Sequence, residues 1–192
     1  MTLDKVDSRE KPPSDRPPRQ ESPISRLARL ISRSARFEND THGLDNGERA
    51  ALARLDPDSE LRPHQIAALS RALVYAELAP ENWHPDTWRR WALIAHGMAL
   101  AGHDGNRSLG LQLSESDVSE SRVTKLLTAR DDAFKQLLPR LLRLLANKEK
   151  SPNWHELGGL ILTEGRNEEE AEAIRLRIAG RYFAAEAKKP KH

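Results

Sequence analysis

Basic side chains recur at helical spacing in several places along the chain, and phosphate binding is the chemistry that this pattern favours. Arg26, Arg29, Arg33 and Arg36 follow a three–four–three spacing, which places four guanidinium groups on one side of a helix. Smaller groups of the same kind are Arg122 with Lys125 and the nearby Arg130, Arg140 with Arg143, and Arg177 with Arg181. Clustered cations bind phosphates well because binding releases condensed counterions. Each group by itself also fits a solvated helix face.

The charge balance allows local basic surfaces but excludes a histone-like polycation. Lys and Arg number 31 against 29 acidic residues, so the net charge is only +2. Arginine outnumbers lysine, and its planar guanidinium suits bidentate phosphate contacts, although a GC-rich genome would produce the same bias. The sequence shows no recognition-helix motif. We therefore expect contacts to the nucleic-acid backbone rather than to base edges.

Signals for an enzyme are weak. His96 and His103 lie seven residues apart with Asp104 adjacent, whereas a zinc protease helix carries two histidines four apart with a glutamate between them. The chain contains no cysteine, which excludes disulfides, thiolate metal sites and a thiol nucleophile. We therefore predict no catalytic activity, cofactor or metal site, and we keep a hydrolase using His96 and His103 as a minor alternative. The absence of cysteine is compatible with the cytoplasm, which is the location that we expect.

Three tryptophans, Trp83, Trp88 and Trp91, lie close together in the sequence. Trp88 and Trp91 share a helix face, so they either stack on nucleic-acid bases or pack in the core. Core packing is the interpretation that we favour, because tryptophan buries a large apolar area. A second hypothesis for the whole protein is a free-standing helical adaptor that binds a protein partner through its tryptophan and leucine surface.

The elements that position these residues are predicted to be helices throughout. Residues 1–23 are polar and rich in proline, which predicts a disordered tail, and residues 188–192 form a short basic tail. Hydrophobic periodicity between the tails predicts an all-α fold without strands or a membrane span. The expected helices cover residues 24–37, 45–55, 63–78, 85–101, 117–129, 132–146, 151–163 and 167–186.

Three local signals fix the expected boundaries of these helices. Asp45 with Glu48 predicts a capping box at the start of the second helix. Asp117 with Glu120 predicts a similar start for the fifth helix. Pro139 lies inside the leucine-rich helix, where it predicts a kink or a break near Leu138.

Four stretches, in their order along the chain, are similar to the CasB family, the small subunit of the type I-E CRISPR surveillance complex Cascade. The similarity covers about residues 44–183. The stretches are LDNGERAALARL at 44–55, WRRWALIAHGMALAGH at 88–103, RSLGLQL at 107–113 with ESRVTKLLTA at 120–129, and LPRLLRLLA at 138–146 with NW at 153–154. The long N-terminal tail and Pro139 depart from the family pattern.

The resemblance implies an all-α domain at residues 24–187, with about eight helices in two packed subdomains. It also implies a non-catalytic subunit that works beside the backbone and large subunits of Cascade and a second copy of itself. Its basic surfaces would hold guide RNA, target DNA and the displaced strand in antiviral defence. The residues that the resemblance assigns to phosphate contacts are Arg54, Arg107, Arg122, Lys125, Arg140, Arg143 and Arg166.

Overall fold

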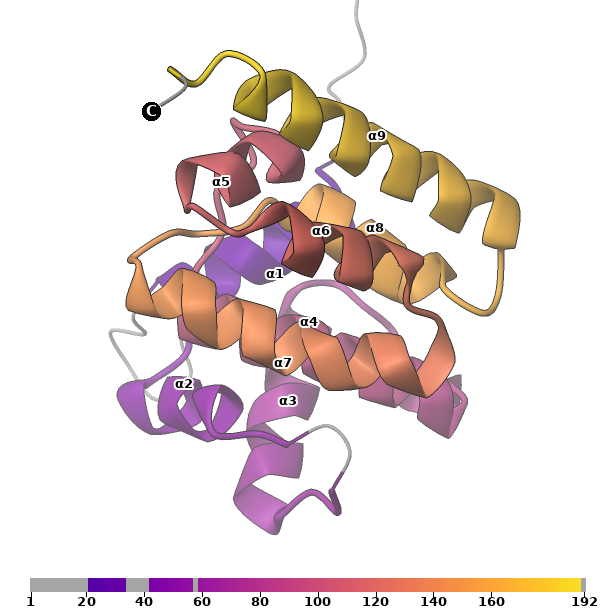
Figure 1. Ribbon diagram of the computed structural model, residues 1–192. Coiled ribbons are helices and arrows are strands. Elements are labelled where there is room, and N and C mark those ends of the chain that lie inside the picture. Colours follow the sequence, from indigo (N-terminus) through magenta and orange to yellow (C-terminus); the bar gives the residue numbers. More distant parts are fainter. Residues whose placement is uncertain (1–20, 34–41, 57–58, 191–192) are drawn as a thin grey trace, which may run out of the picture.

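The computed structural model describes residues 21–33, 42–56 and 59–190, and within these ranges the chain is all-α (Figure 1). The helices are α1 (Pro23–Ser32), α2 (Asn46–Ala53), α3 (Pro63–Tyr75), the 3₁₀ turn η1 (Pro80–Asn82), α4 (Pro85–Ala101), α5 (Leu109–Glu115), α6 (Glu120–Thr128), α7 (Asp131–Asn147), α8 (Trp154–Thr163) and α9 (Glu168–Glu186). The prediction of an all-α fold is confirmed.

Side-chain caps at two helix starts agree with the sequence. The Asp45 carboxylate accepts a hydrogen bond from the Glu48 amide at 2.7 Å, and the Glu48 carboxylate accepts one from the Asp45 amide at 3.0 Å. The Asn167 side chain accepts from the Glu170 amide at 3.2 Å. Both caps satisfy amides that the first turn of a helix leaves unpaired.

Helix ends are less visible in the sequence, because three of them use an acidic residue where glycine is usual. Glu77, Asp117 and Glu149 adopt positive φ angles of 59°, 50° and 54°. After each, a backbone amide reaches back five residues, as in Leu78 N–H to Leu73 O at 3.0 Å. This is the Schellman pattern.

This helix-end geometry corrects two predictions. Helix α3 ends at Tyr75 rather than at Leu78. Asp117 closes α5 instead of opening the next helix, and Ser119 is the N-cap residue of α6.

Other predicted boundaries also need correction. Helix α5 was not predicted, because its seven residues are too few to show a hydrophobic period; Ser108 caps it. Helix α8 begins at Trp154 rather than at Ser151, since the Asn153 side chain caps it. Helix α7 continues through Pro139, so of the predicted kink or break near Leu138 the break does not occur.

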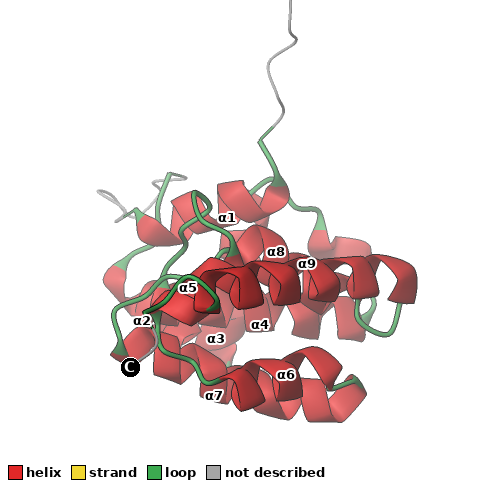
Figure 2. Ribbon diagram, turned by 45° about the horizontal axis from the view of Figure 1, so that its top comes forward, coloured by secondary structure: helices red, strands yellow, loops and turns green. Residues whose placement is uncertain are grey.

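One continuous hydrophobic core joins the helices. Helix α4 contacts α1, α2, α7 and α8, while α8 also packs on α9 (Figures 1 and 2). Trp154 is fully buried across Gly97 of α4, where an added Cβ would lie 2.2 Å from the indole. Gly110 allows α5 to approach α9 in the same way. Glycines therefore set two of the closest helix contacts.

Most of the predicted N-terminal tail lies outside the described residues, whereas residues 188–190 of the predicted C-terminal tail are described. The predicted disorder of residues 1–23 concerns a segment that is described only from Glu21, and Ser22 already caps α1. In the C-terminal basic segment, Lys189 Nζ donates to the Ser114 carbonyl at 2.7 Å. None of the helices in the described ranges is long and apolar enough to cross a membrane.

Candidate nucleic-acid interface

Three of the seven predicted contact residues meet at one groove between α6 and α7. Arg122 and Lys125 from α6 and Arg140 from α7 line this groove, which has a volume of about 370 Å³. Each of the three side chains belongs to an exposed residue. We call this feature the α6–α7 groove. Arg140 is thus brought to the same basic surface as Arg122 and Lys125, although it lies 15 or more positions away from them in the sequence.

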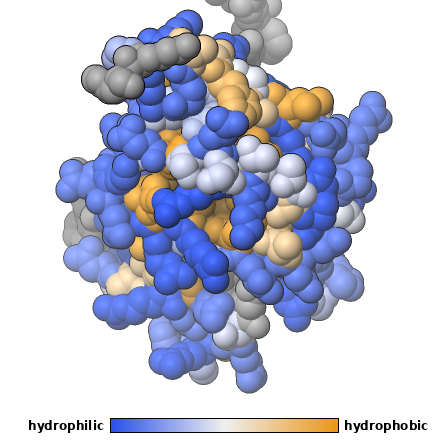
Figure 3. Space-filling model, in the orientation of Figure 1, coloured by the Kyte–Doolittle hydropathy of each residue, from blue (hydrophilic) through white to orange (hydrophobic). Residues whose placement is uncertain are grey.

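The floor of the α6–α7 groove is apolar. Figure 3 shows hydrophobic side chains at the centre of this face, over α6 and α7, surrounded by hydrophilic ones. The residues that line the floor are Leu113, Val118, Val123, Leu126, Leu137, Leu141 and Leu144. An apolar floor lowers the local dielectric, which strengthens the attraction of the bordering cations for an anion.

Arg143 and Arg130 are close in the sequence to the groove residues, but their side chains bind elsewhere. The Arg143 Nε donates to the Pro139 carbonyl at 3.2 Å, and its charge acts on His96 of α4. Arg130 donates to the Leu127 and Ala129 carbonyls and to the Glu172 carboxylate, at 3.0, 3.1 and 3.0 Å. Arg130 therefore ties the α6–α7 connection to α9.

Two predicted contact residues have carboxylate partners within the fold. Arg107 Nη1 lies 2.5 Å from Glu115 Oε2 across α5. Arg166 Nη2 donates to Asp86 Oδ2 and to Thr87 Oγ1, both at 2.8 Å. A hydrogen bond from Arg90, with help from Arg166, lowers the pKa of Asp86 below its ordinary value. Arg166 thus fastens the α8–α9 loop to the start of α4.

Arg54 is exposed at the C-terminal end of α2, away from the α6–α7 groove, and its carbonyl accepts from Gln65 Nε2 at 3.3 Å. The structure therefore separates the seven predicted residues into one groove and several isolated positions. Sequence spacing identified the cations but could not show which of them share a surface.

The arginine stripe predicted for the first helix also divides. Arg26 donates from Nε to the Ala76 carbonyl and from Nη1 to the Glu21 carbonyl, both at 2.7 Å, so it holds α1 against α3. Arg29 and Arg33 face a second groove. Arg36 lies outside the described residues.

His96 and His103 do not converge on one site. His96 Nδ1 lies 3.1 Å from the Leu52 carbonyl on α2, and His103 Nδ1 accepts from the Trp154 amide at 3.2 Å. Burial lowers the pKa of both imidazoles. Across the described part of the chain, no three His, Asp or Glu side chains are grouped in a way that could hold a metal ion.

The tryptophan cluster packs against the core. Trp91 is buried, and its ring stacks on Trp83 at a centroid distance of 5.8 Å. Trp88 meets Trp83 edge to face at 6.0 Å. Trp83 and Trp88 remain partly exposed, yet both pack on the hydrophobic core. The core-packing interpretation therefore agrees with the structure.

Comparison with known protein families shows the family to which this chain belongs. The model of the family CRISPR-associated protein Cse2 matches residues 48–183, which is more than half of the chain. The chain belongs to the Cse2 family. This agrees with the CasB resemblance in the sequence and makes the protein a small subunit of Cascade in CRISPR defence. Searches of curated proteins and of solved structures gave no match.

Proposed function

We propose that this Cse2 subunit is a non-catalytic nucleic-acid clamp, which holds target DNA and guide RNA in Cascade through phosphate contacts. The observation that carries this proposal is the convergence of Arg122, Lys125 and Arg140 on the α6–α7 groove. Guanidinium and ammonium groups at the border of an apolar groove bind phosphate oxygens without reading base edges.

The proposed division of labour leaves sequence recognition to guide pairing. Base pairing between guide and target supplies the specificity, and the protein recognises backbone geometry and charge. The displaced strand, the neighbouring backbone and large subunits and a second copy of this chain are the further partners that we propose. Arg54 and Arg143 supply separate exposed cations, while Arg107 and Arg166 would have to exchange their present carboxylate partners for a phosphate.

The test is a charge reversal in the assembled complex. Arg122→Glu with Lys125→Glu is assembled with the other Cascade subunits and guide RNA, and target DNA binding is measured at several salt concentrations. We expect weaker binding and a flatter salt dependence, by about 0.9 in the log–log slope for each duplex phosphate that the subunit no longer binds. Both residues are exposed, so the subunit should remain folded.

The matched control is Arg62→Glu with Arg89→Glu, which makes the same change in net charge at exposed positions before α3 and on α4. Its target binding should stay close to that of the unmodified complex. Equal affinities for the groove variant and the unmodified complex would refute the clamp. Equal losses in both double variants would show a general charge effect rather than binding at the α6–α7 groove.

The leucine floor of the same groove supports one alternative, a helical adaptor. Leu137, Leu141 and Leu144 present an apolar strip that suits the hydrophobic face of a partner helix. Salt separates the two functions, since an apolar interface depends on ionic strength far less than a phosphate clamp does. The adaptor would be favoured if Leu141→Ser kept the subunit out of the complex while Arg122→Glu with Lys125→Glu left the salt dependence of target binding unchanged.

A further inference from the structure

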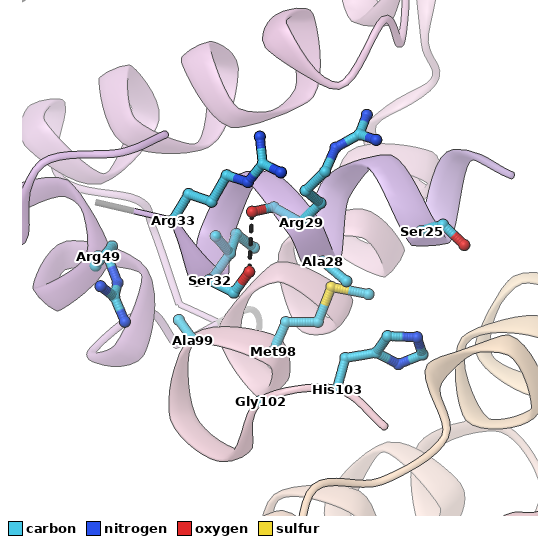
Figure 4. A pocket seen from close by; sticks show the side chains of 11 residues that line it. Ser25, Ala28, Arg29, Ser32, Arg33, Arg49, Met98, Ala99, Gly102 and His103 are labelled. Carbon is cyan, nitrogen blue, oxygen red and sulfur yellow. Dashed lines mark hydrogen bonds between the residues drawn. The ribbon is translucent and has the colours of Figure 1, made fainter. Parts of the chain in front are cut away.

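A second basic groove lies between α1, α2 and the C-terminal end of α4. It has a volume of about 540 Å³ and opens to solvent. Figure 4 shows Arg29 and Arg33 extending from α1 and Arg49 extending from α2, with Met98 between α1 and α4. The remaining lining residues are Ser25, Ala28, Ile31, Ser32, Ala99, Gly102 and His103. We call this feature the α1–α4 groove.

The charged side chains that line the α1–α4 groove are basic as far as the structure describes the chain. Three arginines line it, and none of the described lining residues carries a carboxylate. Arg49 is also held by an interaction within the protein. Glu21 pairs with Arg29 at 2.6 Å from outside the lining. Arg33 forms no ion pair within the described ranges. Like charges on one concave surface raise the local potential and attract an anion.

The end of α1 holds Arg29 and Arg33 at the border of the groove. The Ser32 hydroxyl donates to the Arg29 carbonyl at 2.9 Å, which closes the last turn of α1. Arg33 then leaves the helix in an extended conformation, with its amide bonded to the Arg29 carbonyl at 3.2 Å. Small side chains on the floor, Ala28 and Ala99, leave room for a ligand to approach the guanidinium groups.

Six of the eleven residues that line this groove lie outside the family match. The match begins at residue 48, so it includes Arg49 and His103 but not Arg29 or Arg33. The α1–α4 groove is therefore formed where the N-terminal helix docks on the matched domain. Two of its three arginines, Arg29 and Arg33, come from outside the matched residues.

We propose that the α1–α4 groove is a second binding site for the phosphodiester backbone of a nucleic-acid strand, separate from the α6–α7 groove. Arg29 and Arg33 lie one helical turn apart, so both guanidinium groups reach the same short stretch of phosphates. Arg49 closes on the strand from α2. This inference rests on the proposed nucleic-acid function, but it concerns a different surface and can fail independently.

The first test measures the salt dependence of target binding by the complete complex. Arg29→Gln with Arg33→Gln should weaken binding and reduce the log–log slope by about 0.7–0.9 for each phosphate that the variant no longer binds. Arg62→Gln with Arg89→Gln, at exposed positions before α3 and on α4, is the control with the same charge change. Binding by the α1 variant that equals binding by this control would overturn the proposal.

A second test uses the absence of cysteine from the chain, because one introduced thiol is then unique. Three single-cysteine variants are assembled into the complex. Ser32→Cys reports on the α1–α4 groove, and Ser121→Cys, at an exposed position of α6, reports on the α6–α7 groove. Ala67→Cys, at an exposed position of α3, is the control. Thiol-reactive groups are attached in turn to the backbone of the target strand, the displaced strand and the guide RNA. This arrangement keeps the proposal testable even if the arginine variants misfold.

We expect Ser32→Cys to cross-link to one of the three strands, which would identify the strand that the groove holds. Cross-linking at Ser121→Cys but not at Ser32→Cys would overturn this inference and leave the proposed function in place. No cross-linking at either position would overturn both. Cross-linking of Ala67→Cys at the same yield would mean unspecific labelling and would also count against the site.

Discussion

Arg175 of α9 and Glu164 at the end of α8 form an ion pair inside the protein, with side chains only 3% and 6% exposed. Glu168 and Glu172 lie 3.5 and 3.7 Å from the same guanidinium. Glu164 also accepts a hydrogen bond from the Asp131 amide at 3.1 Å, which opens α7. One buried pair thus joins α7, α8 and α9.

Arg175→Met should destabilise the fold by about 3–5 kcal/mol, because it leaves the Glu164 carboxylate buried without its partner. Urea unfolding followed by circular dichroism measures this loss. Adding Glu164→Gln to Arg175→Met removes the stranded charge and should recover part of the stability. A double variant no more stable than Arg175→Met would contradict the buried-pair explanation.

Gly110→Ala should loosen the packing of α5 on α9. The added Cβ would lie 2.3 Å from the Ile178 carbonyl oxygen and 2.6 Å from the Tyr182 nitrogen, and backbone atoms cannot move aside locally. We expect a cost of about 1–3 kcal/mol in the free energy of unfolding.

Gly180→Ala on α9 is the matched control for this prediction, because nothing lies within 4 Å of its added Cβ. Alanine should stabilise this exposed helical position by about 0.5–1 kcal/mol. The measurement is the melting temperature of both variants, which should fall for Gly110→Ala and rise for Gly180→Ala. A shift in the same direction for the two glycines would mean that helix packing is not what Gly110 contributes.

Stability should fall as the pH drops below the ordinary histidine pKa of about 6.5. Burial lowers the pKa of His96 and of His103, and the neighbouring His155 lowers it further at His103. The unfolded chain therefore takes up protons at a pH where the folded protein does not, so acid favours unfolding. Protonation of His103 at Nδ1 would also remove the acceptor for the Trp154 amide.

The measurement is the urea midpoint from about pH 7.5 to about pH 5.5, across the ordinary histidine range. His96→Gln with His103→Asn should flatten this pH dependence, since the asparagine oxygen can replace Nδ1 as an acceptor. His64→Gln, at an exposed position, should leave the slope as it is. An unchanged slope in the double variant would exclude these two imidazoles as its source.

Arg140→Ala and Arg143→Ala should separate two cations that lie three residues apart on α7. Arg140 lines the α6–α7 groove, whereas Arg143 bonds to the Pro139 carbonyl and lies toward His96. In the assembled complex we expect the larger loss of target affinity, and the larger decrease in salt slope, for Arg140→Ala. Equal effects would mean that the bound strand is not confined to the groove.

Much of the secondary structure could be predicted because its signals are local. The Asp45–Glu48 capping box and the Asn167 cap each depend on side chains and amides within one turn of helix. The ends at Glu77 and Asp117 could not be predicted in this way. Acidic residues adopt the left-handed backbone conformation there, which is unfavourable for residues other than glycine and asparagine. The packing of the adjoining helices holds them in it.

The candidate site was only partly predictable for the same reason. Sequence spacing places Arg122 near Lys125, because residues three apart lie on the same face of a helix. It could not tell that Arg140 joins them while Arg143 turns away, nor that Arg49 of α2 lines the same groove as Arg29 of α1. Those outcomes depend on how α6, α7, α1 and α2 pack.

By itself, the sequence determined the helical class, the supply of arginines and the Cse2 family, because composition, periodicity and motif order are properties of the chain alone. Only the tertiary structure decided which cations border a groove and which are held by carboxylates, as Arg166 is by Asp86. The physical reason is that a cation's availability depends on its neighbours in space. Those neighbours are set by helix packing around buried side chains such as Trp154 on Gly97.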